Sequence, residues 1–335
     1  MIYKAHAIMP SLLHTTAIVR NGFGDSMKIF ITGAAGFLGS ALANQMAKDG
    51  HVVRGLDDLS TGKRENLENQ VDFTLGDVND RPVLWNLLQD IDCVYHLAAK
   101  VLVPESILYP REYNHVNVGG TVSLMEAMRD VGVKRVVFIS SGAVYGFQEE
   151  QPVNERALPN PNSPYAVSKL AAESYVNSIG THCGIETVSL RVFNAYGPGQ
   201  RIPASYAPLI PNLLWQGVRG GSLVVYGNGK QTRDFVYVDD VVRAMILAGS
   251  ASNVDKEVIN VGFGKETSVI SIAERVKEIT KNPADIILTK NDPGETRVCA
   301  NIYKAKKKLN FTPKVSFKEG LQKTFDLDPR FQEED

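Results

Sequence analysis

Short apolar runs alternate with longer helical stretches between residues 28 and 192, and this rhythm constrains the fold more than any other feature. Strands that alternate with helices form a parallel sheet covered by helices on both faces. The apolar runs are 28–32, 51–57, 71–77, 93–99, 135–141 and 186–192. The helical stretches lie near 38–49, 81–89, 109–131 and 164–180.

The rhythm changes after about residue 195. A helical stretch over 206–216 precedes short strands at 223–226 and 234–238, helices near 239–249 and 268–280, and two short helices broken at Pro313. We therefore expect an α/β protein in which a doubly wound parallel sheet over 27–195 carries a smaller α/β region over 196–335. The chain is expected to cross between these lobes, and residues 1–26 to form an extension without a function of its own.

Composition excludes several function classes. The 335 residues carry a formal net charge of −1, so no bulk field attracts nucleic acid or an anionic membrane. No apolar run approaches the roughly 20 residues that span a bilayer. The cysteines, Cys93, Cys183 and Cys299, have neither metal nor disulfide spacing, which favours a cytoplasmic location and predicts no metal site.

A glycine-rich turn, "TGAAGFLG", follows the first predicted strand and opens the first predicted helix. Gly33 permits the tight turn, Gly36 lets a pyrophosphate approach the backbone, and Gly39 allows the helix to pack closely on the strand. Asp57 ends the next strand, where its carboxylate can bind a ribose diol and repel a 2′-phosphate. The pattern predicts a Rossmann-type domain that binds NAD rather than NADP.

The next two strands end in residues that also suit a dinucleotide. Asp77 can accept a hydrogen bond from an adenine amino group, although an ordinary turn aspartate is the alternative. Ala98 and Ala99 are small enough to let a cofactor lie against the sheet. His96 stands in an apolar run and is interpreted as a core histidine rather than a ligand.

A hydroxyl, a phenol and an amine are expected to meet at the same edge of the sheet. Tyr165 and Lys169 share one face of a helix that Ser163 and Pro164 begin. Ser141 ends the fifth strand, where ligands bind in doubly wound folds. An ammonium near a phenol lowers the phenol's pKa, which makes Tyr165 a candidate general base.

These and further motifs together resemble the extended short-chain dehydrogenases that act on nucleotide-diphosphate sugars, most closely the NAD-dependent UDP-hexose 4-epimerases. They are "TGAAGFLG", "HLAA", "SSGAVYG", "YAVSK", "RVFNAYGPGQ" and "QTRDFVYVDD", and the resemblance covers about residues 27–325. It implies that Tyr165 removes the proton of a sugar hydroxyl, Ser141 orients that hydroxyl, and Lys169 holds the nicotinamide ribose. A 4-keto sugar then turns over in the site and is reduced on its opposite face.

The resemblance implies a set of binding residues. The expected NAD-binding residues are Gly33, Gly36, Phe37, Leu38, Gly39, Asp57, Asp58, Leu59, Ser60, Thr61, Gly62, Asp77, Val78, Leu97, Ala98, Ala99, Lys100, Ser140, Tyr165, Lys169 and Phe193. The expected substrate-binding residues are Ser141, Tyr165, Asn194, Leu209, Val224, Tyr226, Arg233, Arg297 and Val298.

Departures from the family pattern bear on the substrate. Dehydratases and decarboxylases of this family carry carboxylates where this chain has Gly142 and Ala143, so epimerisation is favoured. Asn194 stands where glucuronate epimerases often have threonine. Val298 falls at the position that gates the sugar 2-substituent, and its small size implies tolerance of UDP-GlcNAc as well as UDP-Glc.

Other departures concern the phosphates and the hexose. Asp292 replaces a common arginine, so Arg297 is expected to supply that phosphate contact. Arg233 is expected to bind a phosphate, with an ion pair to Asp234 or Asp239 as its structural alternative. At 101–102 the chain has Val and Leu where related enzymes often have small polar residues.

Alternatives to a 4-epimerase are a 4-ketoreductase, a dehydratase, a UDP-glucuronate epimerase and a non-catalytic nucleotide-binding scaffold. The scaffold would be expected to lose Tyr165 or Lys169, and this chain has both. The resemblance also implies a homodimer that packs the helices near 109–131 and 164–180 as a four-helix bundle.

Overall fold

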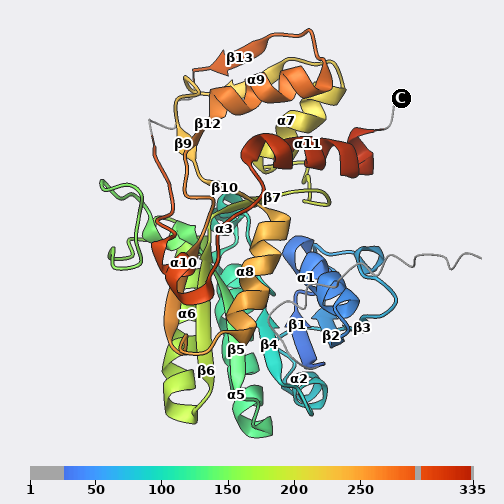
Figure 1. The fold of residues 1–335 in the computed structure, drawn as a ribbon, viewed down its shortest axis with the longest axis vertical. Helices are drawn as coiled ribbons and strands as arrows, with labels where there is room; N and C mark the ends of the chain where they lie inside the picture. Colours follow the sequence, from blue (N-terminus) through green and yellow to red (C-terminus); the bar gives the residue numbers. More distant parts are fainter. Residues whose placement is uncertain (1–25, 291–295, 333–335) are drawn as a thin grey trace, which may run out of the picture.

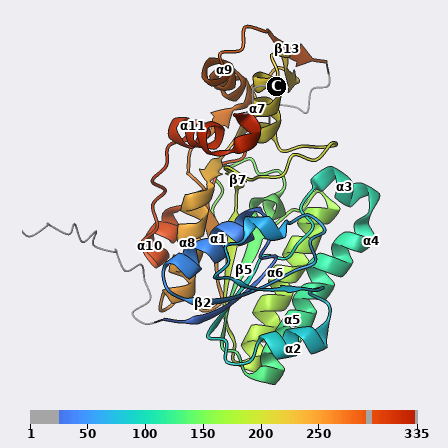
Figure 2. The ribbon, with the colours of Figure 1, turned by 90° about the vertical axis from the view of Figure 1, so that its right-hand side faces the viewer.

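The structure is a computed structural model that describes residues 26–290 and 296–332. Figures 1 and 2 show a large lobe built on a twisted sheet and a smaller lobe above the sheet's upper edge. Nearly all of the expected N-terminal extension, and Asp292, lie outside the described residues.

One parallel sheet of seven strands forms the large lobe, in the order β3-β2-β1-β4-β5-β6-β11. The order reverses between β1 and β4, which is the topological switch point of a doubly wound fold. The predicted fold class is therefore confirmed. The strands are β1 (Lys28–Thr32), β2 (Val52–Asp57), β3 (Asp72–Leu75), β4 (Cys93–His96), β5 (Arg135–Ser141), β6 (Glu186–Val192) and β11 (Glu257–Val261).

Helices cover both faces of this sheet because successive strand residues point to opposite sides. On β1, Ile29 and Ile31 pack in one core with α1 and α8, whereas Phe30 packs in another with α2, α5 and α6. The helices of this lobe are α1 (Phe37–Lys48), α2 (Arg81–Leu87), α3 (Val103–Leu108), α4 (Pro110–Tyr113), α5 (Gly120–Val131), α6 (Pro164–Cys183) and α8 (Val238–Ser250). Short helical turns lie at η1 (Arg64–Asn66) and η3 (Gly142–Tyr145).

The small lobe packs helices around two-stranded pairings, seen at the top of Figure 1. Its sheets pair β10 with β7, β12 with β9 and β13 with β8. The strands are β7 (Asn194–Tyr196), β8 (Leu223–Tyr226), β9 (Thr232–Arg233), β10 (Phe235–Tyr237), β12 (Thr267–Ser268) and β13 (Ile286–Thr289). The helices are α7 (Leu209–Val218), α9 (Val269–Thr280), α11 (Phe317–Leu327) and the turn η4 (Pro329–Phe331), while α10 (Tyr303–Leu309) contacts β11 of the large sheet.

The chain crosses between the lobes after residue 195. Strand β11 pairs in parallel with β6, and α8 packs on α1 and β5, so both belong to the layers of the large lobe. The segment between them and the segment after them return to the small lobe. The two lobes are thus joined by several chain passages, which fixes the small lobe over the sheet.

Two helices differ from the sequence prediction. The stretch 109–131 is helical, but it is divided into α4, a π-helical turn η2 (Asn114–Gly119) and α5. Asn117 in this turn is buried and bonds across to Lys100 and Ser168, which periodicity cannot reveal. Helix α7 begins at Leu209 rather than Tyr206, because Pro208 adopts an extended conformation and Tyr206 has a positive φ of 60°.

We expect Gly39→Ala to destabilise the fold strongly. A Cβ at Gly39 would lie 1.9 Å from the Gly33 carbonyl oxygen, so α1 must move away from the glycine turn. We expect a loss of about 2 kcal/mol or more in the free energy of unfolding, measured by chemical denaturation. Gly221→Ala is the matched control, since its Cβ would meet only one atom at 3.9 Å. Equal stabilities for the two variants would contradict this packing.

Candidate active site

The glycine turn between β1 and α1 leaves room for an anion beside the backbone. Gly33 has φ +69°, and a Cβ there would lie 2.7 Å from the Ala98 amide nitrogen. Gly36 caps α1 without a side-chain hydrogen bond, so backbone N–H groups of the first helical turn remain available. A helix N-terminus with free N–H groups suits a pyrophosphate, and this cradle fits a dinucleotide.

The loop after β2 is held against that turn. The Asp57 carboxylate accepts hydrogen bonds from Ala35 N at 2.9 Å and from Leu59 N at 2.8 Å, and burial raises its pKa. Each carboxylate oxygen has a second acceptor site, so Asp57 can still receive a ribose hydroxyl. Asp58 is exposed and accepts from the Ser60 amide and hydroxyl. The expected loop residues Thr61 and Gly62 follow, and a Cβ at Gly62 would lie 2.7 Å from the Ala35 carbonyl carbon.

The residues after β3 and β4 line the next part of this edge. Asp77 is exposed and accepts from the backbone and side chain of Asn79. His96 is buried between the Thr32 hydroxyl at 2.7 Å and the Thr121 hydroxyl at 2.8 Å. Burial lowers the His96 pKa to about 3, so the ring is neutral, as expected of a core histidine.

Other expected cofactor residues surround this edge at differing depths. Val78, Ser140 and Phe193 are buried, and Phe37, Leu38, Leu97, Ala98, Ala99 and Lys100 are half-buried. The Lys100 ammonium forms a 3.0 Å ion pair with Glu112, so it is not free in this structure. The Thr32 hydroxyl accepts from the Ala98 amide at 3.2 Å, which ties the segment after β4 to β1.

Tyr165, Lys169 and Ser141 meet where α6 passes the carboxyl end of β5. Ser163 caps α6 by accepting from the Ala166 amide, and Pro164 occupies the first turn, as the sequence predicted. The Ser141 side chain lies near enough to the Tyr165 phenol to lower its pKa, and the Tyr113 ring packs edge-on against Tyr165 at 6.5 Å between ring centroids. A phenol and a hydroxyl that lie near one another can share one substrate oxygen.

The Tyr165 pKa is raised in this structure, whereas the sequence predicted that it would be lowered. Burial raises the pKa of Tyr165, and the Ser141 side chain only partly opposes it. Lys169 is 3% exposed and lies 4.4 Å from the centroid of the Phe138 ring. Burial lowers the Lys169 pKa to about 7, so at neutral pH its positive charge is only partly present to act on the phenol.

Sequence reasoning missed Glu173, which lies one helical turn beyond Lys169 on α6. Glu173 is buried and binds Ser140 and Arg191. Its spacing of four residues from Lys169 could have suggested that the two side chains share a helix face. Its hydrogen-bond partners could not be predicted, because they lie on strands β5 and β6. Its negative charge raises the Lys169 pKa and so opposes the effect of burial.

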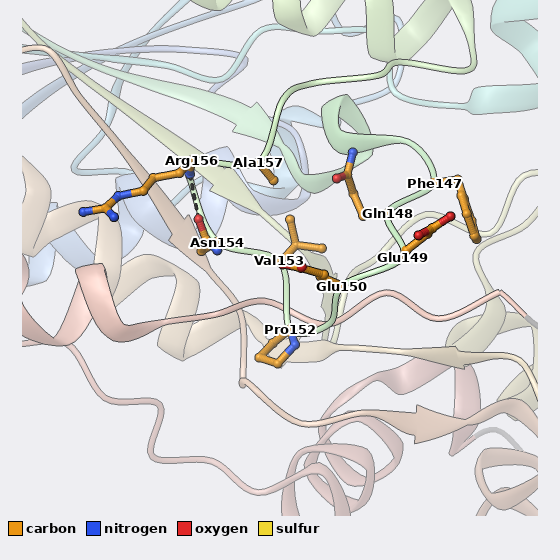
Figure 3. A pocket seen from close by; sticks show the side chains of 9 residues that line it. All are labelled: Phe147, Gln148, Glu149, Glu150, Pro152, Val153, Asn154, Arg156 and Ala157. Atoms are coloured by element: carbon orange, nitrogen blue, oxygen red, sulfur yellow. Dashed lines mark hydrogen bonds between the residues drawn. The ribbon is translucent and has the colours of Figure 1, made fainter.

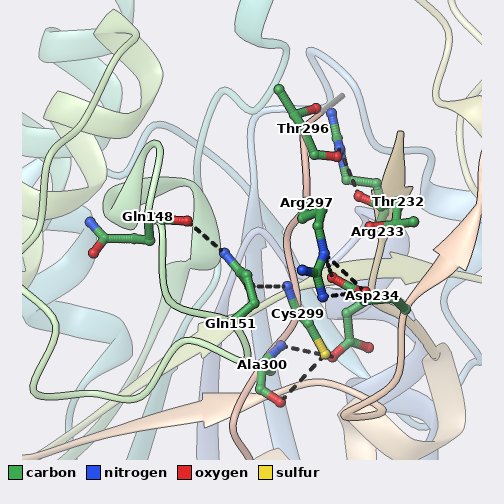
Figure 4. Close-up of polar contacts among 10 residues, drawn as sticks. Gln148, Gln151, Thr232, Arg233, Asp234, Thr296, Arg297, Cys299 and Ala300 are labelled. Atoms are coloured by element: carbon green, nitrogen blue, oxygen red, sulfur yellow. Dashed lines mark hydrogen bonds and ion pairs between the residues drawn. The ribbon is translucent and has the colours of Figure 1, made fainter. Parts of the chain in front are cut away.

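In the small lobe, Asn194 contacts Asp234, the residue that follows Arg233 in the chain. The exposed Asn194 donates from Nδ2 to the Asp234 carbonyl oxygen at 3.0 Å. Arg233 donates to the carbonyl oxygens of Thr232 and Thr296, and burial lowers its pKa (Figure 4). Within the described ranges it has no ion pair, so the alternative of a salt bridge to a neighbouring aspartate is not seen.

Asp234 fastens the small lobe to the segment that carries Val298. Its carboxylate accepts from the amides of Phe263 at 2.7 Å, Gly264 at 2.9 Å and Ala300 at 3.0 Å. Burial raises its pKa to about 6. This aspartate therefore sets how the segment before Ala300 lies against Arg233, which the sequence alone did not indicate.

The remaining expected substrate residues are spread around the small lobe. The Arg297 guanidinium pairs bidentately with the Glu266 carboxylate, at 3.0 and 2.9 Å. A phosphate that bound Arg297 would have to displace this carboxylate or share the guanidinium with it. Val298 is half-buried against a cluster containing Tyr145 and Phe193. Leu209 and Val224 are half-buried, and Tyr226 is 59% exposed.

A hollow of about 570 Å³ is formed by the loop that follows η3, as Figure 3 shows. It is lined by Phe147, Gln148, Glu149, Glu150, Pro152, Val153, Asn154, Arg156 and Ala157. None of these is an expected site residue. This loop contacts the segment that follows Val298. The Gln151 side-chain oxygen accepts from the Cys299 amide, and Val153 forms an isolated parallel β-bridge with Ala300.

We expect Lys169→Met to stabilise the cofactor-free protein in a pH-dependent way. Burial holds the folded-state pKa of Lys169 at about 7, below the ordinary lysine value of 10.5. Protonation of Lys169 therefore opposes folding below pH 10.5, and this penalty is complete below about pH 7. Since one pKa unit is worth about 1.4 kcal/mol, the gain should be a few kcal/mol at pH 6 and much smaller at pH 10. Denaturant unfolding at both pH values checks this; a gain independent of pH would contradict it.

Comparison with known proteins identifies the family. Residues 29–262 match the NAD dependent epimerase/dehydratase family. The UDP-glucose 4-epimerase of Mycolicibacterium smegmatis is 36% identical over 310 residues, covering 90% of this chain and 98% of the relative. No helix in 26–290 or 296–332 is both long and apolar enough to cross a membrane.

Solved structures agree with this relationship. A UDP-glucose 4-epimerase from Thermotoga maritima, solved with UDP-glucose, superposes with a TM-score of 0.87 at 34% identity and covers 92% of this chain and 100% of its own. A UDP-N-acetylglucosamine 4-epimerase from Methanobrevibacter ruminantium gives a TM-score of 0.85 at 34% identity, with 90% and 97% covered. A UDP-glucuronic acid 4-epimerase from Bacillus cereus gives 0.82 at 35% identity, with 90% and 98% covered. The chain therefore belongs to the NAD-dependent epimerase/dehydratase family.

Proposed function

We propose that this chain is a UDP-hexose 4-epimerase that interconverts UDP-Glc with UDP-Gal and also accepts UDP-GlcNAc. The observation that carries this proposal is that Tyr165 lies near Ser141 and one helical turn from the buried Lys169, while Ser141 ends a strand at the same sheet edge as the glycine turn. Bound NAD supplies an acceptor for the hydride of the sugar C4 and returns it later.

Tyr165 and Ser141 are proposed to transfer and orient the proton of the sugar 4-hydroxyl. In the proposed reaction the sugar O4–H bond breaks and its proton passes to the Tyr165 oxygen, while the C4–H bond electrons leave as hydride and C4=O forms. The Ser141 hydroxyl donates to the same oxygen and keeps it in line with the phenol. Reduction from the other face reverses each transfer, so Tyr165 returns the proton and the net reaction is redox-neutral.

Two positive charges favour the ionised phenol in the loaded site. Burial raises the Tyr165 pKa in the cofactor-free protein, so the base form needs added stabilisation. An ammonium on Lys169 and an oxidised nicotinamide each favour a nearby phenolate. The charge state of Lys169 is therefore central to the activity we propose.

The packing at Gly142 supports epimerisation over elimination. A Cβ at Gly142 would lie 3.0 to 3.1 Å from three atoms of the Phe193 ring, so an acidic side chain there would press on a buried aromatic. Phe193 is itself an expected cofactor residue. By the resemblance, a dehydratase would need an Asp-Glu pair at 142–143 and a decarboxylase a glutamate there, and this sequence has Gly142 and Ala143.

Incubation of the purified protein with each UDP-sugar tests the proposal. We expect UDP-Glc and UDP-GlcNAc each to give the galacto epimer, followed by the anomeric proton signals in NMR, and UDP-GlcA to remain unchanged. Absence of UDP-GlcNAc conversion beside brisk UDP-Glc conversion would show that Val298 does not open the 2-position. Conversion of UDP-GlcA alone would instead favour a glucuronate epimerase.

We further propose a homodimer through the helices that carry and support the site. Helix α6 leaves Val167 52% and Tyr175 47% exposed, and the neighbouring α3 exposes Ile107 and Leu108. Exposed apolar side chains on neighbouring helices are typical of an interface.

Light scattering tests the dimer. The wild-type protein should have twice the mass of the chain, and the double variant Val167→Glu with Tyr175→Glu should have the mass of one chain, because the new charges would be buried in the interface. A monomeric wild type would contradict the proposal.

A further inference from the structure

Three buried or half-buried side chains follow one another on a single face of α6. Tyr165, Lys169 and Glu173 are spaced four residues apart, so each lies one helical turn below the last. Lys169 and Glu173 are 3% and 6% exposed. The function proposed above uses Tyr165 and Lys169, and leaves the buried carboxylate below them without a role.

The Glu173 carboxylate is held by the two strands beneath the helix. Its Oε2 accepts from the Ser140 hydroxyl at 2.7 Å and from Arg191 Nε at 3.1 Å, while Oε1 accepts from Arg191 Nη2 at 2.6 Å. Ser140 directly precedes Ser141 on β5, and Arg191 lies on the adjacent β6. The carboxylate therefore ties the helix of Tyr165 and Lys169 to the strand of Ser141.

Lys169 has no direct ion-pair or hydrogen-bond partner in the described part of the chain, and its ammonium rests on the Phe138 ring. On α6 itself, Tyr165 and Glu173 share the face of Lys169. The elements packed around α6 carry further titratable or charged side chains, which are His96 at the end of β4, Glu105 on α3, Arg111, Glu112 and Tyr113 on α4, His115 in η2, Glu126, Arg129 and Asp130 on α5, Arg135 on β5, Tyr145 in η3, and Glu186 and Arg191 on β6. The His96 ring is neutral, and Glu105 accepts from the Tyr113 hydroxyl. Glu173 is the carboxylate whose charge acts on Lys169.

We propose that Glu173 is a positioning residue for the reaction: clamped by Ser140 and Arg191, its carboxylate supplies the counter-charge that keeps Lys169 an ammonium beside Tyr165. The inference rests on the proposed function for its catalytic meaning, but its electrostatic content can be measured without substrate. Burial alone would leave the lysine neutral over much of the physiological range. A fixed carboxylate one turn away opposes that loss without forming a direct pair that would draw the ammonium away from a ribose.

Glu173→Gln separates charge from shape. The amide keeps the length of the side chain and one oxygen acceptor, but it carries no charge. Glu173→Asp keeps the charge and shortens the side chain by one methylene. Glu186→Gln is the matched control, because Glu186 lies on β6 but is exposed and pairs with Arg135.

The direct test is the titration of Lys169 in the full-length protein, with and without saturating NAD. Lysines labelled with ¹³C at the ε-carbon are followed by NMR, and the signal lost in Lys169→Met assigns the resonance. We expect the Lys169 pKa to fall by about one unit or more in Glu173→Gln. It should stay within a few tenths of wild type in Glu173→Asp and Glu186→Gln. An unchanged pKa in Glu173→Gln overturns the proposal.

The pH profile of turnover connects this titration to the reaction. In Glu173→Gln the alkaline limb of kcat should move to lower pH by the same amount as the Lys169 pKa, and Glu173→Asp should restore it. A purely structural role would lower kcat without moving the limb, and that result also overturns the proposal. If no UDP-sugar is converted while Lys169 titrates as expected, the proposed function fails and the electrostatic inference stands.

The single variant leaves Arg191 buried without its partner, so it can fail to fold. Glu173→Gln with Arg191→Met removes the whole pair, and replacing a buried ion pair by groups of similar volume is usually tolerated. Arg191 is bound to the Glu173 carboxylate, so removing its positive charge offsets part of the effect of removing Glu173. The double variant is therefore expected to show a smaller fall in the Lys169 pKa than Glu173→Gln, and a wild-type value in it contradicts the proposal.

Discussion

Parallel strands bring all their carboxyl ends to one edge of a sheet, and the rest of this molecule is arranged around that edge. The glycine turn, Asp57, Asp77, Ala98 and Ser141 all lie at or just beyond the ends of strands of the large sheet. The reversal of strand order between β1 and β4 lies at this edge, and ligands of doubly wound folds bind outside the carboxyl ends of strands at such a reversal. The small lobe stands above the same edge in Figures 1 and 2, so a ligand between the lobes would meet both sets of residues.

Buried charge gives the site its chemical character. Lys169 is held in a position where burial disfavours its charged form, and Glu173 with Arg191 forms a closed ion pair beneath it. A buried pair of this kind contributes little net stability, because desolvation offsets the attraction between its members. Its value lies in fixing a charge and an orientation next to reactive groups. Asp234 plays a comparable part in the small lobe, where three backbone amides converge on one carboxylate.

Local pattern was enough to predict most of the large lobe. The runs at 28–32, 135–141 and 186–192 match β1, β5 and β6 residue for residue, because a strand buried on both faces is mostly apolar in its interior. The cap of α6 and the burial of His96 also followed from the sequence. These features depend on neighbouring residues and on burial, which sequence pattern records well.

What the sequence could not supply depends on contacts between distant segments. The clamp on Glu173 joins residues from α6, β5 and β6, and the pairing of Arg297 with Glu266 joins two loops of the small lobe. The direction of the Tyr165 pKa was predicted wrongly because a helical spacing reveals a nearby lysine but not the burial of both groups. Burial depends on the assembled fold, and its effect on the Tyr165 pKa is larger than that of the neighbouring polar groups.

The most direct measurement follows the hydrogen on the sugar carbon rather than any residue. The UDP-hexose that the protein epimerises would be prepared with deuterium at C4 and converted in ordinary water with catalytic NAD. If Tyr165 moves only the hydroxyl proton while hydride leaves and returns within the site, the product should retain its deuterium at C4 in full. Loss of deuterium to solvent during epimerisation would contradict the account, because it would mean that a base of the protein removes the C4 hydrogen as a proton.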